Sequence, residues 1–241
     1  MKIGKEKFKV WGDVFDEFTH DTIVRLITQR YFDGLESPIS IGKEANLFSA
    51  QCDDKRVIVK IYRLETCNFN KMYEYIKADP RYIDLKGKKR KLILNWVERE
   101  YRNLQKARAI GIPVPMPITL LNNVLVLEFI GEDGDIAPKL KDKKPKKSRI
   151  FFNEILSNIK KLYEAGYVHA DLSGFNILNY NERPVFIDFS QATPLENPRS
   201  NEFLERDIHN ICSFFNKHGV SADEKKILEW IKSVNKPSKP S

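Results

Sequence analysis

The sequence predicts an α+β protein in which a β-rich lobe is followed by an α-rich lobe. Two observations on periodicity support this class. Up to residue 129, short runs of β-branched and apolar residues separated by turn residues indicate strands. From Ser148 onward, apolar residues recur every three or four positions, which is typical of helices. The composition, 41% hydrophobic and 31% charged over 241 residues, supplies a core and excludes a largely disordered chain.

The chain is expected to begin with helices and to continue as a sheet. Residues 13–31 carry apolar residues at helical spacing, which predicts one or two amphipathic helices. Strands over 46–52 and 56–62 should form a hairpin around the turn at 53–55. Residues 63–90 are polar and basic, and we expect a long mobile loop there.

One helix and a second hairpin complete this lobe. Apolar residues from 92 to 107 have helical spacing, and Gly111 is placed to end that helix. Residues 116–121 and 124–129 predict two strands joined by the Asn122-Asn123 turn. The first lobe is therefore a small sheet with one long helix.

The α-rich lobe should contain five elements. They are a helix over 148–163 that Gly166 can cap, short strands near 177–178 and 185–187, and helices over 204–215 and 223–234.

These elements divide the chain into four segments. We expect a helical extension over 1–30, the β-rich lobe over 31–129, the α-rich lobe over 130–234 and a frayed tail over 235–241. Ligand sites are common between two lobes, so we expect a ligand cleft there.

The positive charge is concentrated in two runs. The formal net charge is +8, and residues 86–91 and 139–149 hold twelve of the 41 lysines and arginines. Such runs are either solvated loops or a contact surface for a polyanion. The sequence leaves both interpretations open.

Several features predict a cytoplasmic protein without membrane contact. The most apolar run, residues 124–127, is far shorter than a membrane-spanning helix requires. The N-terminus has no apolar signal segment, and the three cysteines form no C-x-x-C motif.

The strongest chemical signal is the string YVHADLSGFN at 167–176, followed by FIDF at 186–189. Phosphoryl transfer needs a carboxylate near the acceptor, and an amide and a second carboxylate that hold magnesium. Asp171, Asn176 and Asp188 have this order and spacing.

Phosphoryl transfer also needs a cation for the nucleotide phosphates. Lys60 lies within an apolar strand, so its stem should be buried and its ammonium group needs an anionic partner. Glu98 and Glu100 are the candidates on the following helix. Glu100 is favoured because Leu104 and Ala107 follow it at i+4 and i+7 on the packed face.

These motifs resemble those of the protein-kinase-like superfamily, and more closely those of the RIO family of atypical kinases. The resemblance runs from about residue 38 to 215 and rests on SIGKEAN at 40–46, HADLSGFN at 169–176, IDFSQ at 187–191 and FLERDIHNI at 203–211. The GKEAN and IDFSQ forms are similar to those of the Rio-one subgroup.

The resemblance implies a two-lobed protein-kinase-like fold with a β-rich N-lobe and a truncated α-rich C-lobe. Asp188-Phe189-Ser190 stands in place of Asp-Phe-Gly, and no Ala-Pro-Glu follows. The truncation would remove the surface on which other kinases hold a substrate peptide.

The resemblance also implies ATP and Mg²⁺ as cofactors, with Mn²⁺ as an alternative metal. The implied catalytic residues are Lys60, Asp171 and Asp188, and the metal ligands are Asn176 and Asp188. The implied nucleotide-binding residues are Ile41, Gly42, Lys43, Lys60, Glu100, Glu128 and Ile130.

Two further polar positions receive structural interpretations. His169 is expected to brace the catalytic loop, and Asp207 to accept hydrogen bonds from catalytic-loop N–H groups. In the family the counterpart of Asp188 is also thought to accept the phosphoryl group.

The implied partners are the precursor of the small ribosomal subunit and its rRNA, together with a protein acceptor that includes the chain itself. Two other function classes stay open. Aminoglycoside and choline kinases have a similar Asp-Asn-Asp pattern. Their cationic substrates favour an acidic pocket, and the net charge of +8 argues against that class. A non-enzymatic RNA-binding module is the third class.

Overall fold

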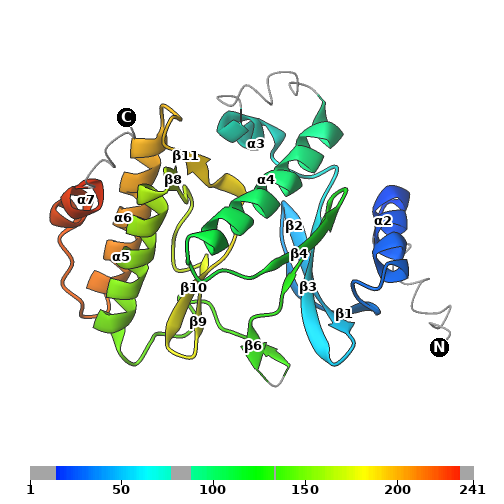
Figure 1. Cartoon of the computed structure of the whole chain (residues 1–241), viewed down its shortest axis with the longest axis horizontal. Coiled ribbons are helices and arrows are strands. Elements are labelled where there is room, and N and C mark those ends of the chain that lie inside the picture. The colour runs from blue at the N-terminus through cyan, green and yellow to red at the C-terminus, as the bar shows by residue number, and fades with distance from the viewer. Residues whose placement is uncertain (1–14, 77–87, 133, 234–241) are drawn as a thin grey trace, which may run out of the picture. The chain divides into compact units, whose positions relative to one another are not determined.

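The computed structural model describes residues 15–76, 88–132 and 134–233 (Figure 1). It is an α+β structure in which an antiparallel sheet precedes a mainly helical region. None of the helices in these stretches has both the length and the apolar character that crossing a bilayer requires.

The described residues form two compact units. The first unit contains residues 15–76, 88–101 and 116–129, and the second contains residues 102–115, 130–132 and 134–233.

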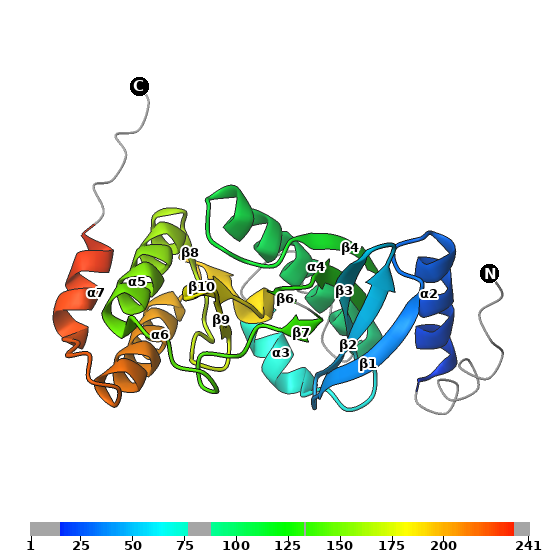
Figure 2. The ribbon, with the colours of Figure 1, turned by 90° about the horizontal axis from the view of Figure 1, so that it is seen from below.

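The first unit is built on a five-stranded antiparallel sheet in the order β1-β2-β3-β5-β4 (Figures 1 and 2). Both predicted hairpins are confirmed, β2–β3 and β4–β5. The strands are β1 (Gly34–Ile41), β2 (Ala45–Cys52), β3 (Lys55–Tyr62), β4 (Pro117–Leu121) and β5 (Val124–Glu128).

Helix α2 (Glu17–Thr28) precedes the sheet, within the range where helices were predicted. Its N-cap is Asp16, whose carboxylate accepts a hydrogen bond from the Thr19 backbone N–H at 3.0 Å. An N-cap carboxylate satisfies an N–H group that lacks a partner within the helix. The predicted helical residues 13 and 14 lie outside the described residues.

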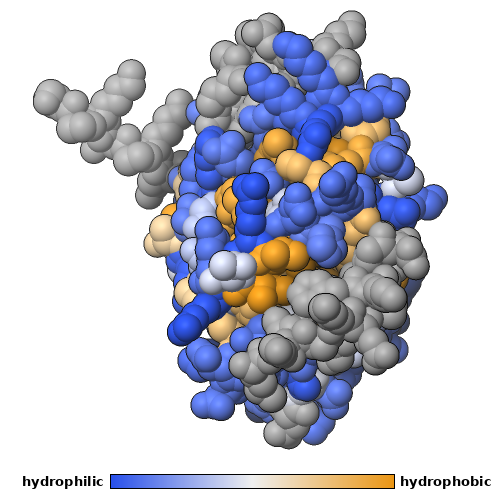
Figure 3. Space-filling view, turned by 90° about the vertical axis from the view of Figure 1, so that its right-hand side faces the viewer, coloured by the Kyte–Doolittle hydropathy of each residue, from blue (hydrophilic) through white to orange (hydrophobic). Residues whose placement is uncertain are grey.

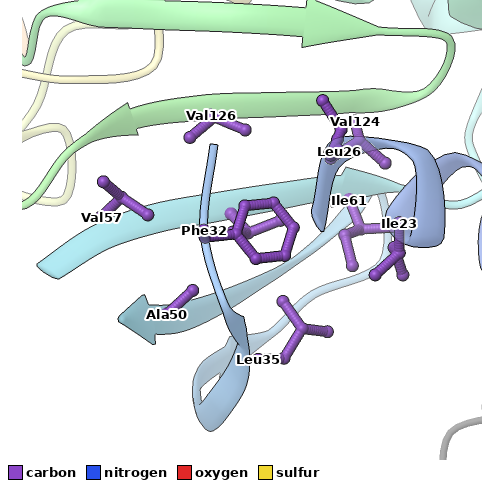
Figure 4. Packing of buried hydrophobic residues seen from close by; sticks show 10 residues of the cluster. Ile23, Leu26, Phe32, Leu35, Ala50, Val57, Ile61, Val124 and Val126 are labelled. Atoms are coloured by element: carbon purple, nitrogen blue, oxygen red, sulfur yellow. The ribbon is translucent and has the colours of Figure 1, made fainter. Parts of the chain in front are cut away.

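The core of the first unit lies between α2 and one face of the sheet (Figure 4). Ile23 and Leu26 of α2 pack against Val57, Val59 and Ile61, which alternate along β3. Side chains two residues apart on a strand share a face, so Ile58, Lys60 and Tyr62 belong to the other face. Fully burying one such aliphatic side chain stabilises the fold by about 1.5–3 kcal/mol.

Partly buried hydrophobic residues border this core. Phe15, Ile27, Tyr31 and Phe48 pack against it, with the rings of Phe15 and Phe48 edge to face at a centroid distance of 5.7 Å. Figure 3 views the molecule from the side on which α2 lies and shows hydrophobic residues reaching the surface between hydrophilic ones.

The predicted mobile loop at 63–90 is partly wrong, because helix α3 (Phe69–Ile76) lies within it. Met72 and Tyr75 of α3 are buried, and the Tyr75 ring lies 6.2 Å from the Trp96 ring. Apolar residues at helical spacing, such as Met72 and Tyr75, give a mostly polar segment one apolar face with which a short helix can pack.

Helix α4 (Lys89–Ala109) is the long helix that the periodicity predicted, and Gly111 follows it with a left-handed φ of 75°. It begins inside the first basic run, so Lys89 to Lys91 are helical and not part of a loop. The guanidinium carbon of Arg90 lies 3.5 Å from the centroid of the Phe18 ring. Residues 86 and 87 of that run lie outside the described residues.

The second unit is dominated by three helices that lie side by side (Figures 1 and 2). They are α5 (Ser148–Glu164), α6 (Ser200–Asn216) and α7 (Glu224–Lys232), and all three were predicted. The Phe152 and Phe215 rings join α5 to α6 at a centroid distance of 5.0 Å.

Short antiparallel strand pairs accompany these helices, one before α5 and two between α5 and α6 in the part of the chain that the structure describes. Strands β9 and β10 were predicted as separate short strands, and they pair as an antiparallel hairpin. The pairs β8–β11 and β6–β7 consist of two-residue strands too short to give a periodic signal. The strands are β6 (Gly131–Glu132), β7 (Asp135–Ile136), β8 (Tyr167–Val168), β9 (Ile177–Tyr180), β10 (Arg183–Phe186) and β11 (Thr193–Pro194).

Candidate active site

The first unit contains a buried ion pair between Lys60 of β3 and Glu100 of α4. The Lys60 Nζ lies 2.8 Å from Glu100 Oε1, and the two residues are 7% and 1% exposed. The Tyr62 hydroxyl donates a hydrogen bond to the other carboxylate oxygen, Glu100 Oε2. Both oxygens of the buried carboxylate therefore have donors.

Strand and helix periodicity together produce this pair. Lys60 and Tyr62 lie on the face of β3 opposite Val59, and Glu100 lies on the packed face of α4 with the buried Leu104. Glu100 is the partner that helix spacing favoured over Glu98. Removing one member of a buried ion pair leaves an uncompensated charge, which costs about 3–5 kcal/mol.

A tight turn connects β1 to β2 at Gly42. The Gly42 N–H donates to the Ala45 carbonyl at 3.1 Å, and a Cβ atom on Gly42 would lie only 2.7 Å from that oxygen. Glycine is needed here because of this close approach. Lys43 and Ile41 flank the turn, and the Ile41 side chain is exposed.

Glu128 is the last residue of β5, and Ile130 lies two residues later. The Glu128 N–H donates to the Met116 carbonyl at 2.9 Å, and the Glu128 carboxylate accepts from the Met116 N–H at 2.9 Å. The Ile130 carbonyl accepts from the Ala137 N–H at 2.8 Å. Hydrogen bonds to the backbone of Met116 therefore hold Glu128, and a hydrogen bond from the backbone of Ala137 holds Ile130.

The second unit holds Asp171 and Asn176 in one closed loop between β8 and β9. The Asn176 side-chain amide donates to the Asp171 carbonyl at 2.8 Å and to its carboxylate at 3.2 Å. The Asn176 backbone N–H donates to the Ser173 carbonyl at 3.0 Å. Because the Asn176 side-chain nitrogen donates to Asp171, the amide oxygen is the atom of this side chain that can serve as a ligand.

Asp207 of α6 holds the start of this loop, as predicted. Its carboxylate accepts from the backbone N–H groups of Ala170 and Leu172, both at 2.8 Å, and Arg206 donates to the Ala170 carbonyl. Burial raises the pKa of Asp207 to about 7, although the two N–H donors and Arg206 act to lower it. Ala170 has a left-handed φ of 66°, which costs a non-glycine residue about 1 kcal/mol.

His169 is a buried neutral brace. Its Nε2 lies 3.2 Å from the Ile187 carbonyl, and its ring packs edge to face on Phe189 at 4.6 Å. Burial lowers the pKa of His169 to about 4, although the nearby Asp188 acts to raise it. A carbonyl can only accept, so Nε2 carries the proton and Nδ1 does not. The ring links the loop of Asp171 to the strand that precedes Asp188.

Asp188 closely follows β10 and precedes a 3₁₀ turn, η2 (Phe189–Gln191). It has a left-handed φ of 63°, and its carboxylate Oδ1 accepts a hydrogen bond from the Ser190 hydroxyl at 2.8 Å. The Ile187 N–H donates to the Asn176 carbonyl at 3.0 Å, so the two motif segments are joined. Strained backbone of this kind persists where the surroundings fix it and is common at functional sites.

Asn103 of α4 supports the segment after Asp188. Its side-chain amide donates to the carbonyls of Phe189 at 3.0 Å and Ala192 at 2.9 Å. Asn103 and Tyr62 were not identified from the sequence. The signal for Asn103 was its place three residues after Glu100, since an amide on a packed helix face must find partners.

The structure therefore brings the predicted residues together in two groups. Lys60 and Glu100 form one group in the first unit, and Asp171, Asn176 and Asp188 form the other in the second unit. Amide and carboxylate oxygens are ligands that magnesium prefers, so Asn176 and Asp188 fit that metal. Among the described residues, no three His, Cys, Asp or Glu side chains cluster as a metal site.

Comparison with known proteins gives the family. A family model described as RIO domain matches residues 46–227. The RIO-type serine/threonine-protein kinase Rio1 of Methanocaldococcus jannaschii is 40% identical over 94% of this chain and 78% of the relative, and Rio1 of Haloferax volcanii is 36% identical with the same coverage. The chain belongs to the RIO family of kinases, in its Rio1 subgroup.

Solved structures show the RIO kinase fold directly. A Rio2 kinase from Chaetomium thermophilum, crystallised as an ADP/Mg²⁺-phosphoaspartate complex, has a TM-score of 0.69 at 20% identity, with 90% of this chain and 67% of that chain covered. The α+β kinase-like fold predicted from the motifs is thus confirmed. The matched RIO domain includes every residue of both groups and leaves out the turn at 41–43.

Proposed function

We propose that the protein is an ATP- and Mg²⁺-dependent RIO-type serine/threonine kinase with ATPase activity. The observation that supports it most is the buried Lys60–Glu100 pair. A lysine in the interior of a β-strand is costly unless its charge is used, and here a buried carboxylate holds the ammonium group in one position.

Each residue has a separate proposed role. Lys60, oriented by Glu100, contacts the α- and β-phosphates, and Asp171 positions the attacking hydroxyl. Asn176 and Asp188 provide the metal ligands. Magnesium, or Mn²⁺ in its place, would neutralise charge on the transferring phosphates.

The remaining proposed contacts are to the nucleotide. Ile41 and Lys43 border the turn whose tightness depends on Gly42, and we assign this turn to the phosphates. The Gly42 N–H already donates to Ala45, so the contribution of Gly42 is space, while Lys43 supplies charge. The backbone of Glu128 and Ile130 is assigned to adenine.

We further propose that Asp188 accepts the phosphoryl group during ATP hydrolysis. Its carboxylate oxygen would attack the γ-phosphorus, the bond to the β-phosphate oxygen would break, and ADP would leave. Water would then hydrolyse the acyl phosphate to restore the carboxylate. The Chaetomium Rio2 kinase was crystallised with ADP, Mg²⁺ and a phosphoaspartate, which supports this step.

The proposed partners are the precursor of the small ribosomal subunit and its rRNA, in the cytoplasm, with a protein acceptor that includes the chain itself. The net charge of +8 supports a polyanionic partner.

The test is turnover of γ-labelled ATP with Mg²⁺, measured for the protein alone, with small-subunit particles, and with an aminoglycoside or choline. The proposal predicts label in inorganic phosphate and in protein. Label transferred mainly to the small molecules would favour the small-molecule phosphotransferase class instead.

A further inference from the structure

The second basic run, residues 139–149, is bonded to the loop that holds Asp171. The Leu140 N–H donates to the Ile177 carbonyl at 2.8 Å, and the Lys141 N–H donates to the Gly174 carbonyl at 3.0 Å. These backbone bonds attach the start of the basic run to the segment that carries Asp171 and Asn176.

Gly174 is where the two segments approach each other closely. A Cβ atom on Gly174 would lie 3.5 Å from both the backbone nitrogen and the Cβ of Lys141, and 3.4 Å from the Phe214 ring. The Asn179 N–H adds a bond of 2.8 Å to the Pro138 carbonyl. The start of the basic run therefore has a fixed position relative to the catalytic loop, and so would a ligand bound there.

Phe175 is the exposed large hydrophobic residue of that loop. It lies between Asp171 and Asn176 in the sequence, and 58% of it is exposed. The Lys141 Nζ lies 4.8 Å from the centroid of its ring, and the same Nζ is 2.8 Å from the Asp142 carboxylate. A large aromatic side chain exposed in an otherwise bonded loop is available to stack on a planar ligand.

The basic run that contacts Phe175 through Lys141 is strongly positive. The run has seven lysines and arginines against one aspartate, and a further carboxylate, that of Glu182, accepts from the Lys146 N–H at 2.6 Å. The basic side chains of the run that reach solvent include Lys141, Lys143, Lys144, Lys146, Lys147 and Arg149.

We propose that Phe175 and this basic run form a binding site for a single-stranded polynucleotide. A base stacks on Phe175 and the adjoining phosphates contact the lysines, the combination that single-strand-binding proteins use. An acidic protein would use the lysines but would have no need of an exposed aromatic ring. The inference rests on the proposed function only for the identity of the natural partner as RNA, and its test needs no ATP.

The experiment measures binding of fluorescent oligomers of about ten units by anisotropy over a salt series. The probes are oligouridylate RNA, a DNA oligomer of the same length, and an abasic phosphodiester of the same charge. We expect base-bearing probes to bind roughly tenfold tighter than the abasic probe, because one stacked base contributes a factor of that order. Equal binding of the RNA and DNA probes would show that the site recognises the bases and phosphates that the two probes share and does not distinguish ribose from deoxyribose.

Two sets of variants separate the ring from the charge. Phe175→Leu should remove the preference for bases without changing the salt slope, and Phe175→Trp should retain it. Replacing Lys143 and Lys144 by Ser should flatten the slope and keep the preference for bases. Thermal melting of each variant checks that it is folded.

A matched control is available on α7. Trp230 is 44% exposed and has Lys160 Nζ 4.4 Å from its ring, so it also pairs an exposed aromatic with a lysine. Trp230→Leu should leave the preference for bases unchanged. Equal binding of base-bearing and abasic probes, an equal loss in Trp230→Leu, or no binding to any probe would overturn the proposal. An inactive wild-type protein that still prefers bases would reject the proposed kinase function and keep this site.

Discussion

The Tyr62 hydroxyl donates a hydrogen bond to Glu100, the same carboxylate that pairs with Lys60. Tyr62 donates to Oε2, whereas the Lys60 Nζ pairs with Oε1. The Lys60 Nζ also lies 5.1 Å from the centroid of the Tyr62 ring. Glu100 and Tyr62 therefore both position the lysine, Glu100 through its charge and Tyr62 through its hydroxyl group and its ring.

Tyr62→Phe should lower both stability and turnover. The change keeps the ring but leaves Glu100 Oε2 without this donor in a buried place, which costs about 1–3 kcal/mol. Urea unfolding measures the first effect and ATP turnover the second. Tyr31→Phe, a change in a partly buried tyrosine on the α2 side of the sheet, is the control. Equal effects of the two substitutions would show that the Tyr62 hydroxyl has no special role.

Glu100→Ala should lower turnover more than Glu98→Ala. Glu100 pairs with Lys60, and removing it leaves a buried lysine uncompensated, so unfolding should also become about 3–5 kcal/mol easier. Parallel turnover and denaturation measurements on the two variants check this. Turnover that falls more in Glu98→Ala would mean that the pair does not orient the lysine for phosphate binding.

His169 and Asp207 should respond to pH in opposite directions. The pKa of His169 falls from 6.5 to about 4 on folding, so its contribution to stability is present above pH 6.5 and is lost as the pH falls towards 4. The pKa of Asp207 rises from 3.8 to about 7, so its contribution is present below pH 3.8 and is lost as the pH rises towards 7. The two effects oppose each other between about pH 4 and 6.5.

Replacing either group should therefore reveal the pH dependence of stability that the other contributes. Relative to the wild type, the stability of Asp207→Asn should increase from pH 4.5 to 6.5, and that of His169→Gln should decrease, each by at most about 1.4 kcal/mol per pH unit. Urea unfolding at three pH values provides the measurement. Slopes of the same sign in the two variants would contradict these pKa directions.

The sequence predicted those parts of the site that depend on one periodic element. Glu100 could be selected over Glu98 because the packed face of a helix repeats with a known period, and Leu104 marked that face. Tyr62 lies in the correctly predicted strand, but its hydrogen bond to Glu100 depends on how closely β3 and α4 pack. No local sequence pattern contains that information. Asn103 was missed for the same reason, since its partners Phe189 and Ala192 are more than eighty residues away.

Composition was a poor guide where short segments pack. The polar composition of residues 63–90 predicts a loop, yet Met72 and Tyr75 provide enough buried surface for a helix over Phe69–Ile76. The charge of the basic run at 139–149 does not indicate where the run lies relative to the site. Backbone bonds from Leu140 and Lys141 attach it to the catalytic loop, and backbone bonds leave no trace in residue type.

Asp188→Asn tests whether this protein turns over ATP with a metal held by Asn176 and Asp188. An amide cannot supply the anionic ligand that magnesium requires, and it cannot accept a phosphoryl group. The measurement is Mg²⁺-dependent turnover of γ-labelled ATP by the purified variant beside the wild type, with folding checked by thermal melting. Turnover by the variant should fall to the level measured without Mg²⁺, whereas near wild-type turnover by a folded variant would show that Asp188 holds no catalytic metal.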